Sequence, residues 1–330
     1  MTVGNSFYEK SNIPKIIGEL KHVSFGPNER FRETAVELGR ILKLGDSQEL
    51  VDQLVSPPDS LTTPEKFNWF FLMDLINFHF FYDNYDPYVV KLQDKSYVGS
   101  MAGAAAINRW LLQHSSRVIA PLFLGLARPE FIKDIFKAEN GEDIPLIEER
   151  IKMIHETYTN MLNLKTNFYE ASLNRKFDPK AMVDFLVTNF EHFRDFGQFG
   201  STQIAFHKRA QLLVKDVLTN CAADIKQLGF TIKMDYLSVF ADYRIPQVLR
   251  HYGLIKYTDE LNSAIAAGPL TDPTMEVEIR AITLAACDRL SQIMGIPSAE
   301  LDTLLWKKRR VIGPSLDERY PFHRYRTTAY

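Results

Sequence analysis

One carboxylate of this chain stands in a setting that suits chemistry on a sugar. Asp242 lies between the aromatic residues Phe240 and Tyr243, and Pro246 follows at a position where it can open a helix. The partial positive charge at a helix N-terminus favours a carboxylate just upstream of it. A carboxylate among aromatic rings can stabilise a cationic, oxocarbenium-like transition state. The same residues fit a second interpretation equally well, in which Asp242 caps the helix or pairs with Arg244.

Two further aspartates could bind a ligand. Asp74 and Asn77 lie three residues apart in a segment, 67–81, that is apolar on nearly every side, so a helix there would place both on one face. A buried carboxylate needs a partner, because burying it unpaired is costly. Asp74 could therefore bind a ligand, or it could tie neighbouring helix ends together. Asp302 stands one turn before Trp306, so these two side chains can meet on one helix face.

Basic residues supply two candidate sets for a phosphate group. Lys208 and Arg209 open a helical stretch, and a guanidinium matches phosphate oxygens with two parallel hydrogen bonds. The same pair would also fit a solvated basic turn. His323 and Arg324 belong to a basic, aromatic tail, which is unusual for a frayed terminus. The basic run 307–310 is expected to be a solvated helix end rather than a nucleic-acid groove.

Motifs that would indicate other chemistry are absent from the sequence. There is no Gly-rich phosphate loop, no His-Glu-x-x-His, no paired Cys-x-x-Cys and no Gly-x-Ser-x-Gly. His79, His114 and His251 have no companion at metal-ligand spacing, and Cys221 and Cys287 form neither a disulfide framework nor a clustered metal site. We therefore expect no metal and no cofactor.

The segments that must position these residues are mainly helical. Thr62 or Thr63 can cap a helix, with Pro64 in its first turn and Glu65 placed for a capping box. The apolar residues that follow predict a helix from about Pro64 to Phe81, buried at the centre of the protein.

Further helices are expected elsewhere along the chain. Apolar residues recur at helical spacing over three stretches, 146–162, 279–293 and 298–306. Gly295 should end the second of these helices, and Ser298 should cap the third. Strand signals are confined to short candidates at 88–92 and 230–234. These patterns predict an all-α or mainly α protein.

Length and charge limit the class of protein. The chain of 330 residues is 45% hydrophobic and 24% charged, which is typical of a globular protein, and we expect one domain over 1–330 that could consist of two interlocked helical lobes. A formal net charge of −2 disfavours nucleic acid and anionic membranes as partners. The longest apolar stretch, 118–127, is too short to span a bilayer, and the first ten residues lack an apolar signal core. A cytoplasmic or nuclear location is expected, while the oligomeric state is not indicated.

The candidate residues belong to a longer series of short segments that begins at about residue 64. The series comprises 68–69, Asp74, 77–78, Tyr97 with Gly99, 105–109, 145–150, 208–211, 240–244, 246–249, 276–280, 301–302, 305–306 and 321–324. Taken together and in this order, these segments resemble the queuosine salvage protein family, the queuosine 5′-phosphate N-glycosylases. The combination is specific, although each piece alone is short.

The resemblance implies a mainly helical fold like that of DNA glycosylases and an activity that releases the base queuine from queuosine 5′-monophosphate by hydrolysis. By position, the family's catalytic aspartate corresponds to Asp242, and its base-binding residues include Phe240 and Asp302. Lys307 occupies a position where the family has a second acidic residue. The segment 22–60 contains no clear counterpart of the histidine that lines the family's base pocket.

The implied substrate explains why such residues are needed. A 7-deazaguanine has carbon in place of N7, so protonation there cannot activate the leaving group. An ionised Asp302 could accept hydrogen bonds from N1–H and the exocyclic amine, and Phe240 offers a stacking face. Asp242 would act either as nucleophile or as electrostatic stabiliser of the sugar cation. Two rival classes are a DNA-repair glycosylase, which the acidic net charge disfavours, and a non-catalytic helical interaction protein.

Overall fold

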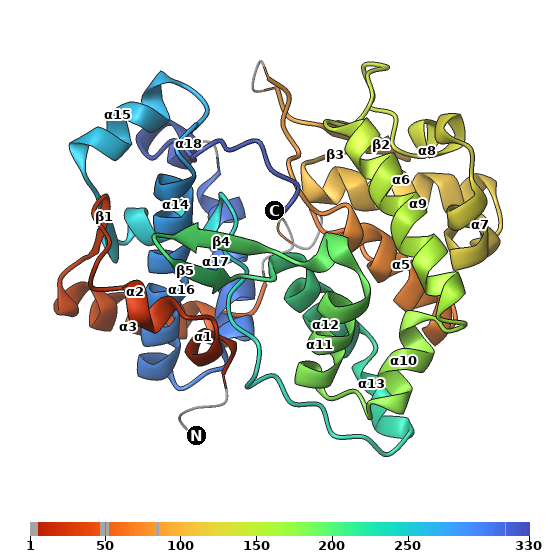
Figure 1. Ribbon diagram of the computed structural model, residues 1–330, viewed down its shortest axis with the longest axis horizontal. Helices are drawn as coiled ribbons and strands as arrows, with labels where there is room; N and C mark the ends of the chain where they lie inside the picture. The colour runs from red at the N-terminus through yellow and green to blue at the C-terminus, as the bar shows by residue number, and fades with distance from the viewer. Residues whose placement is uncertain (1–5, 47–49, 51–52, 84–85, 314) are drawn as a thin grey trace.

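The computed structural model describes residues 6–46, 50, 53–83, 86–313 and 315–330, and helices dominate it (Figure 1). The predicted mainly α fold is therefore confirmed. The strands of the described residues form three antiparallel pairs, β1 (Val23–Phe25) with β6 (Ile255–Tyr257), β2 (Val89–Leu92) with β3 (Lys95–Val98), and β4 (Phe196–Phe199) with β5 (Thr202–Ala205). The strand predicted at 88–92 is confirmed as β2. The one predicted at 230–234 is wrong, because that segment has no regular structure.

One hydrophobic core is built mainly from the middle of the chain, on the right in Figure 1. Its centre is α5 (Thr63–Leu75), which packs against α12 (Lys208–Asn220). The other elements around this core are α6 (Ser100–Gln113), η1 (Ser116–Ile119), α7 (Pro121–Leu126), α8 (Pro129–Ile135), α9 (Ile147–Asn163), α10 (Phe168–Asn174), α11 (Pro179–Asn189), η2 (Glu191–Phe193) and α13 (Ala222–Gln227).

A second core joins the two ends of the chain, so that red and blue elements lie together on the left in Figure 1. Its centre is the buried helix α16 (Pro273–Met294), and the pairing of β1 with β6 ties the N-terminal segment to it. The other helices here are α1 (Phe7–Lys10), α2 (Ile13–Ile16), α3 (Asn28–Leu44), α14 (Ile245–His251), α15 (Asp259–Ala267), α17 (Ser298–Ile312) and α18 (Ser315–Arg319). One domain of two interlocked lobes stays a prediction, which the two cores support.

Helix α5 begins as predicted but ends earlier than predicted. Thr62 and Glu65 form the expected capping box, and most of the helix is buried. The helix ends at Leu75 rather than near Phe81. Two buried arginines explain this end, because Arg209 donates to the carbonyl of Leu75 while Arg150 donates to those of residues 76, 78 and 79. The backbone carbonyl groups at this end of α5 thus accept hydrogen bonds from arginine side chains instead of from a further helical turn.

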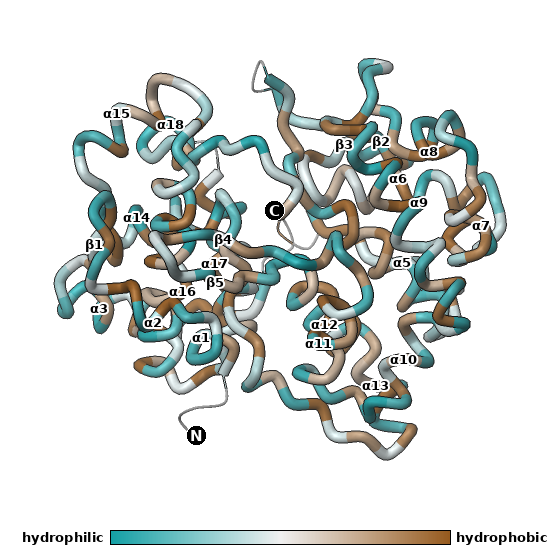
Figure 2. Tube along the Cα trace, in the orientation of Figure 1, coloured by the Kyte–Doolittle hydropathy of each residue, from teal (hydrophilic) through white to brown (hydrophobic). Residues whose placement is uncertain are grey.

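The helices predicted in the C-terminal half are confirmed, with one shift at a cap. Helix α16 ends at Met294 and is capped by Gly295, as predicted, because the φ of 68° at Gly295 is a left-handed value that glycine adopts without strain. Helix α17 begins at Ser298, so the capping position is Pro297 and not Ser298. No helix of the described residues is long and apolar enough to cross a membrane, and hydrophilic residues interrupt the helices throughout Figure 2.

Candidate active site

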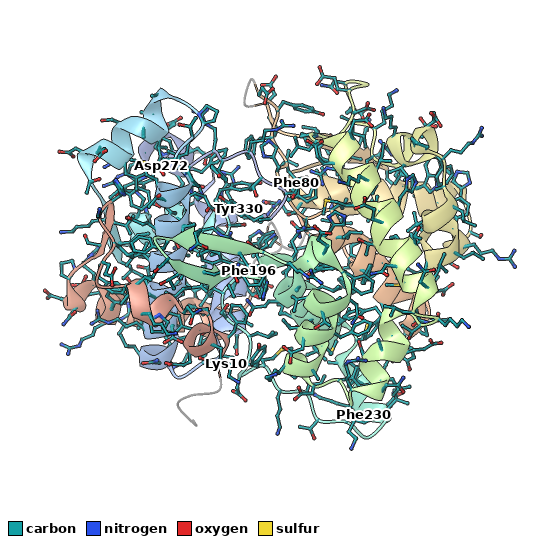
Figure 3. The ribbon with its side chains drawn as sticks, in the orientation of Figure 1. Lys10, Phe80, Phe196, Phe230, Asp272 and Tyr330 are labelled. Carbon is teal, nitrogen blue, oxygen red and sulfur yellow. The ribbon has the colours of Figure 1, made fainter. Side chains whose placement is uncertain are left out.

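A cavity of about 460 Å³ opens between the two cores and receives residues from both. Phe80 and Tyr330, labelled in Figure 3, lie near the middle of the molecule and belong to its wall. The predicted site residues that line it are Asp74, Asn77, Lys208, Phe240, Asp242, Tyr243, Asp302 and Trp306. Segments that are far apart in the sequence therefore meet around one ligand-sized space.

Asp242 is held just before α14 by two backbone groups. Its Oδ1 accepts hydrogen bonds from the backbone N–H of Arg244 at 2.7 Å and of Ile245 at 3.0 Å. The carboxylate thus caps the start of the helix and also lines the cavity, so the two interpretations of this residue are compatible. The expected alternative of a pair with the Arg244 side chain is wrong, because that guanidinium pairs with Asp317 at 2.8 Å.

Asp302 of α17 connects its helix to the loop that carries Asp242. Its Oδ1 accepts the backbone N–H of Phe240 at 2.9 Å. Burial raises the pKa of Asp302 to about 7, and the nearby charge of Asp242 adds to the rise, against the hydrogen bond from Phe240. Near neutral pH the ligand-free carboxyl group is therefore divided between its two forms, and the ionised form is the one that the expected base contact uses.

The end of α5 brings a carboxyl, an amide and an ammonium group together. Asn77 lies just beyond the helix but still donates to Oδ1 of Asp74 at 3.2 Å. Lys208 donates to the backbone carbonyl of Asn77 at 3.0 Å. Oδ2 of Asp74 is buried and has no hydrogen-bond partner among the described residues. Burial, together with the charge of Asp216, raises the pKa of Asp74 well above its usual value, which favours the protonated form of this carboxyl group.

Three of the predicted site residues lie outside the cavity wall. Arg209 is 4% exposed, and its guanidinium is bound by the backbone carbonyls of Leu75 and His192. His323 is buried beside the hydroxyl of Tyr330, at 3.2 Å, and burial lowers its pKa to about 3. Arg324 presents its backbone carbonyl to Leu270. Neighbouring residues of the tail reach the cavity instead.

Two expectations about basic residues are wrong. Lys208 and Arg209 do not form a solvated turn, because both are buried within α12. The run 307–310 is not a solvated helix end, since Lys307, Arg309 and Arg310 line the cavity. The helical spacing of these residues after Asp302 was the sequence signal that could have revealed the shared face.

A buried ion pair that the sequence did not indicate supports the site from behind. Arg280 of α16 binds both carboxylate oxygens of Asp195, at 2.9 and 2.6 Å, and donates to the carbonyl of Ala241 at 3.1 Å. Asp195 also accepts the backbone N–H of Lys208 at 3.0 Å. The pair of Asp195 and Arg280 therefore positions both the residue before Asp242 and the start of α12.

These features define a helical protein built around a cavity whose wall combines carboxylates, cations and aromatic rings. Residues 58–330 match the model of a family described as queuosine salvage protein, and the chain belongs to this family.

Several curated proteins are similar to the chain. A mouse (Mus musculus) protein is 31% identical over 278 residues, which cover 79% of this chain and 81% of that protein. A bacterial protein from Sphaerobacter thermophilus is 30% identical over 273 residues, covering 80% and 81%. A sea anemone (Nematostella vectensis) protein is 30% identical over 228 residues, covering 68% of this chain and 65% of its own length. All three are named queuosine 5′-phosphate N-glycosylase/hydrolase.

Proposed function

We propose that this protein hydrolyses the N-glycosidic bond of queuosine 5′-monophosphate and releases queuine. The observation that carries the proposal is the position of Asp242, whose carboxylate lines the cavity while its Oδ1 is held by two backbone N–H groups. A carboxylate that is oriented before the reaction can stabilise charge that develops on a substrate sugar. The names of the similar proteins support the same substrate class.

The proposed chemistry on the sugar side uses Asp242. Because Oδ1 binds the backbone, Oδ2 is the oxygen that we propose faces C1′ of the ribose. The bond between C1′ and the base nitrogen breaks, and its electron pair leaves with the base. Water then supplies the hydroxyl group for C1′ and the proton for the base. Asp242 either adds covalently to C1′ before water does or stabilises the cation through space.

The base side of the proposal uses Asp302 and the aromatic wall. Asp302 would accept hydrogen bonds from N1–H and the exocyclic amine of the 7-deazaguanine, which favours its ionised form. Phe240 is the proposed stacking face, with Tyr243 and Trp306 as neighbouring walls. Lys208 is a further proposed ligand contact, since its ammonium group lines the cavity near three carboxyl groups.

Two further proposed ligand contacts are Asp74 and Asn77, which also line the cavity. Oδ2 of Asp74 lacks a hydrogen-bond partner among the residues described, so a ligand hydroxyl or amine could satisfy it. The raised pKa of Asp74 favours its protonated form, which can both donate and accept a hydrogen bond and so suits a ligand group of either kind.

The experiment is a search for the released base. Purified protein is incubated with queuosine 5′-monophosphate, without added metal or nucleotide cofactor, and queuine is quantified by mass spectrometry. Guanosine 5′-monophosphate serves as the substrate control, because it shares the sugar and phosphate but carries a different base. Failure to release queuine from the intended substrate after long incubation would refute the proposal.

A further inference from the structure

The cavity is also lined by three arginines that the proposed chemistry does not use. Arg244 precedes α14, while Arg309 and Arg310 stand in the last turn of α17. The two oxygens of Asp317 bind Arg244 and Arg309, each at 2.8 Å. Nε of Arg310 donates to the side-chain oxygen of Gln53 at 3.1 Å. Each guanidinium is thus anchored while it borders the same space.

Positive charge is in excess here. Among the described residues, Asp317 forms ion pairs with Arg244 and Arg309, and no carboxylate forms one with Arg310. Lys307 adds no net charge, because it pairs with Asp46. Burial lowers the pKa of Arg310 to about 10, and repulsion by Arg309 and Arg244 contributes to the shift. A dianion placed among these groups would relieve the repulsion and balance the charge.

The guanidiniums are also oriented by aromatic rings. The guanidinium of Arg244 lies over the ring of Phe322 at 4.2 Å, and that of Arg310 lies over the ring of Trp306 at 5.0 Å. Such stacking leaves the edge of a guanidinium available, and the edge carries the donors that bind phosphate oxygens.

Helix α17 sets the distance between these arginines and the proposed base site. Asp302 and Arg310 are eight residues apart on one continuous helix, which corresponds to about 12 Å along its axis. That length is comparable with one nucleotide from its base edge to its phosphate. Asp242 lies between the two ends, because its Oδ1 is bonded to the backbone of Arg244 and its loop contacts Asp302 through Phe240.

We propose that Arg244, Arg309 and Arg310 form the subsite for the 5′-phosphate of the substrate. The proposal rests on the proposed function and names the residues that recognise the phosphate monoester. It replaces Lys208 and Arg209 in that role. The ammonium group of Lys208 is influenced by the charges of Asp242, Asp74 and Asp302, a setting that disfavours an anion, and Arg209 does not line the cavity.

The test compares Arg309→Gln, Arg310→Gln and their combination with the parent protein. The matched control is Lys308→Gln, because Lys308 lies on the same helix but pairs with Glu37 and does not line the cavity. Each arginine variant should lower kcat/KM for queuosine 5′-monophosphate by about ten- to hundredfold, mainly through KM, as expected for a lost charged hydrogen bond. Hydrolysis of the nucleoside queuosine should change less than about threefold. Arg310→Lys, which keeps the charge, should restore part of the loss.

A binding measurement separates this proposal from the proposed function. Ribose 5-phosphate is titrated into each folded variant by calorimetry, with ribose as the reference ligand. Binding by the parent and the Lys308→Gln variant, with loss in the double arginine variant, would support the subsite even if no queuine were released. Equal losses on nucleotide and nucleoside, or ribose 5-phosphate binding no better than ribose, would overturn it.

Discussion

Replacement of Asp242 by asparagine separates the charge of this residue from its structural role. Oδ1 accepts the backbone N–H groups of Arg244 and Ile245, and an asparagine side chain can keep both bonds through its carbonyl oxygen. Asp242→Asn should therefore preserve the cap of α14 and the fold. Asp242→Ala should lose the cap and about 1 kcal/mol of folding free energy. The asparagine variant thus lacks the negative charge and carries an amide NH2 group in place of Oδ2.

The size of the expected loss follows from the electrostatic interaction with the sugar cation. Opposite unit charges about 4 Å apart attract by about 4 kcal/mol at an effective dielectric constant near 20. Asp242 is only partly buried, so solvent screens part of this energy. We expect a loss in kcat of about a hundredfold or more, comparable with the removal of one transition-state donor. Affinity for queuine should change little, because the charge acts mainly in the transition state.

The assay measures queuine release at saturating queuosine 5′-monophosphate, together with thermal unfolding and queuine binding. Asp178→Asn is the matched control, because Asp178 caps α11 through the backbone N–H of Ala181 at 2.8 Å and does not line the cavity. A folded Asp242→Asn variant that turns over within a few-fold of the parent would refute the catalytic role. An unfolded variant would instead show that the carboxylate is needed for the cap.

Three further predictions follow from buried charges. The pKa of Asp302 is about 7 and the proposed base contact needs its ionised form, so the affinity for queuine should fall below pH 7 by up to about tenfold per pH unit. Asp302→Asn should flatten this pH dependence, measured by calorimetry. A variant with the same pH profile as the parent would contradict the contact. The raised pKa of Asp74 means that the folded protein keeps a proton which the unfolded chain releases above about pH 4, so stability falls with rising pH. Asp74→Asn should then gain more in Tm over the parent at about pH 8 than at about pH 5, and an equal gain would argue against a raised pKa of Asp74. Asp195→Ala removes the carboxylate that binds Arg280 with both oxygens and leaves Glu276, at 3.4 Å, as the ion-pair partner among the described residues. The change should cost about 3–5 kcal/mol in urea unfolding, against less than about 1 kcal/mol for Asp184→Ala at an exposed pair, and similar costs would contradict the role of the buried pair.

Local sequence determined where several elements begin and end. The capping box of Thr62 and Glu65 starts α5, Pro246 stands in the first turn of α14, and Gly295 stops α16. Each signal acts within a few residues, so it can be read without knowledge of the rest of the chain. The candidate residues Phe240 and Asp242 were identified together for the same reason, since both belong to one short loop.

Only the tertiary structure decided which polar residues share the cavity. Lys208 and Arg209 are adjacent in sequence, yet one lines the cavity while the other binds backbone carbonyls at the end of α5. The same contact ends α5 before Phe81, against its apolar pattern. Burial and charges from distant segments set the pKa of Asp302, and the last turn of α17 turned out to face the cavity. Such properties depend on contacts between residues far apart in the chain, and helical periodicity alone does not encode them.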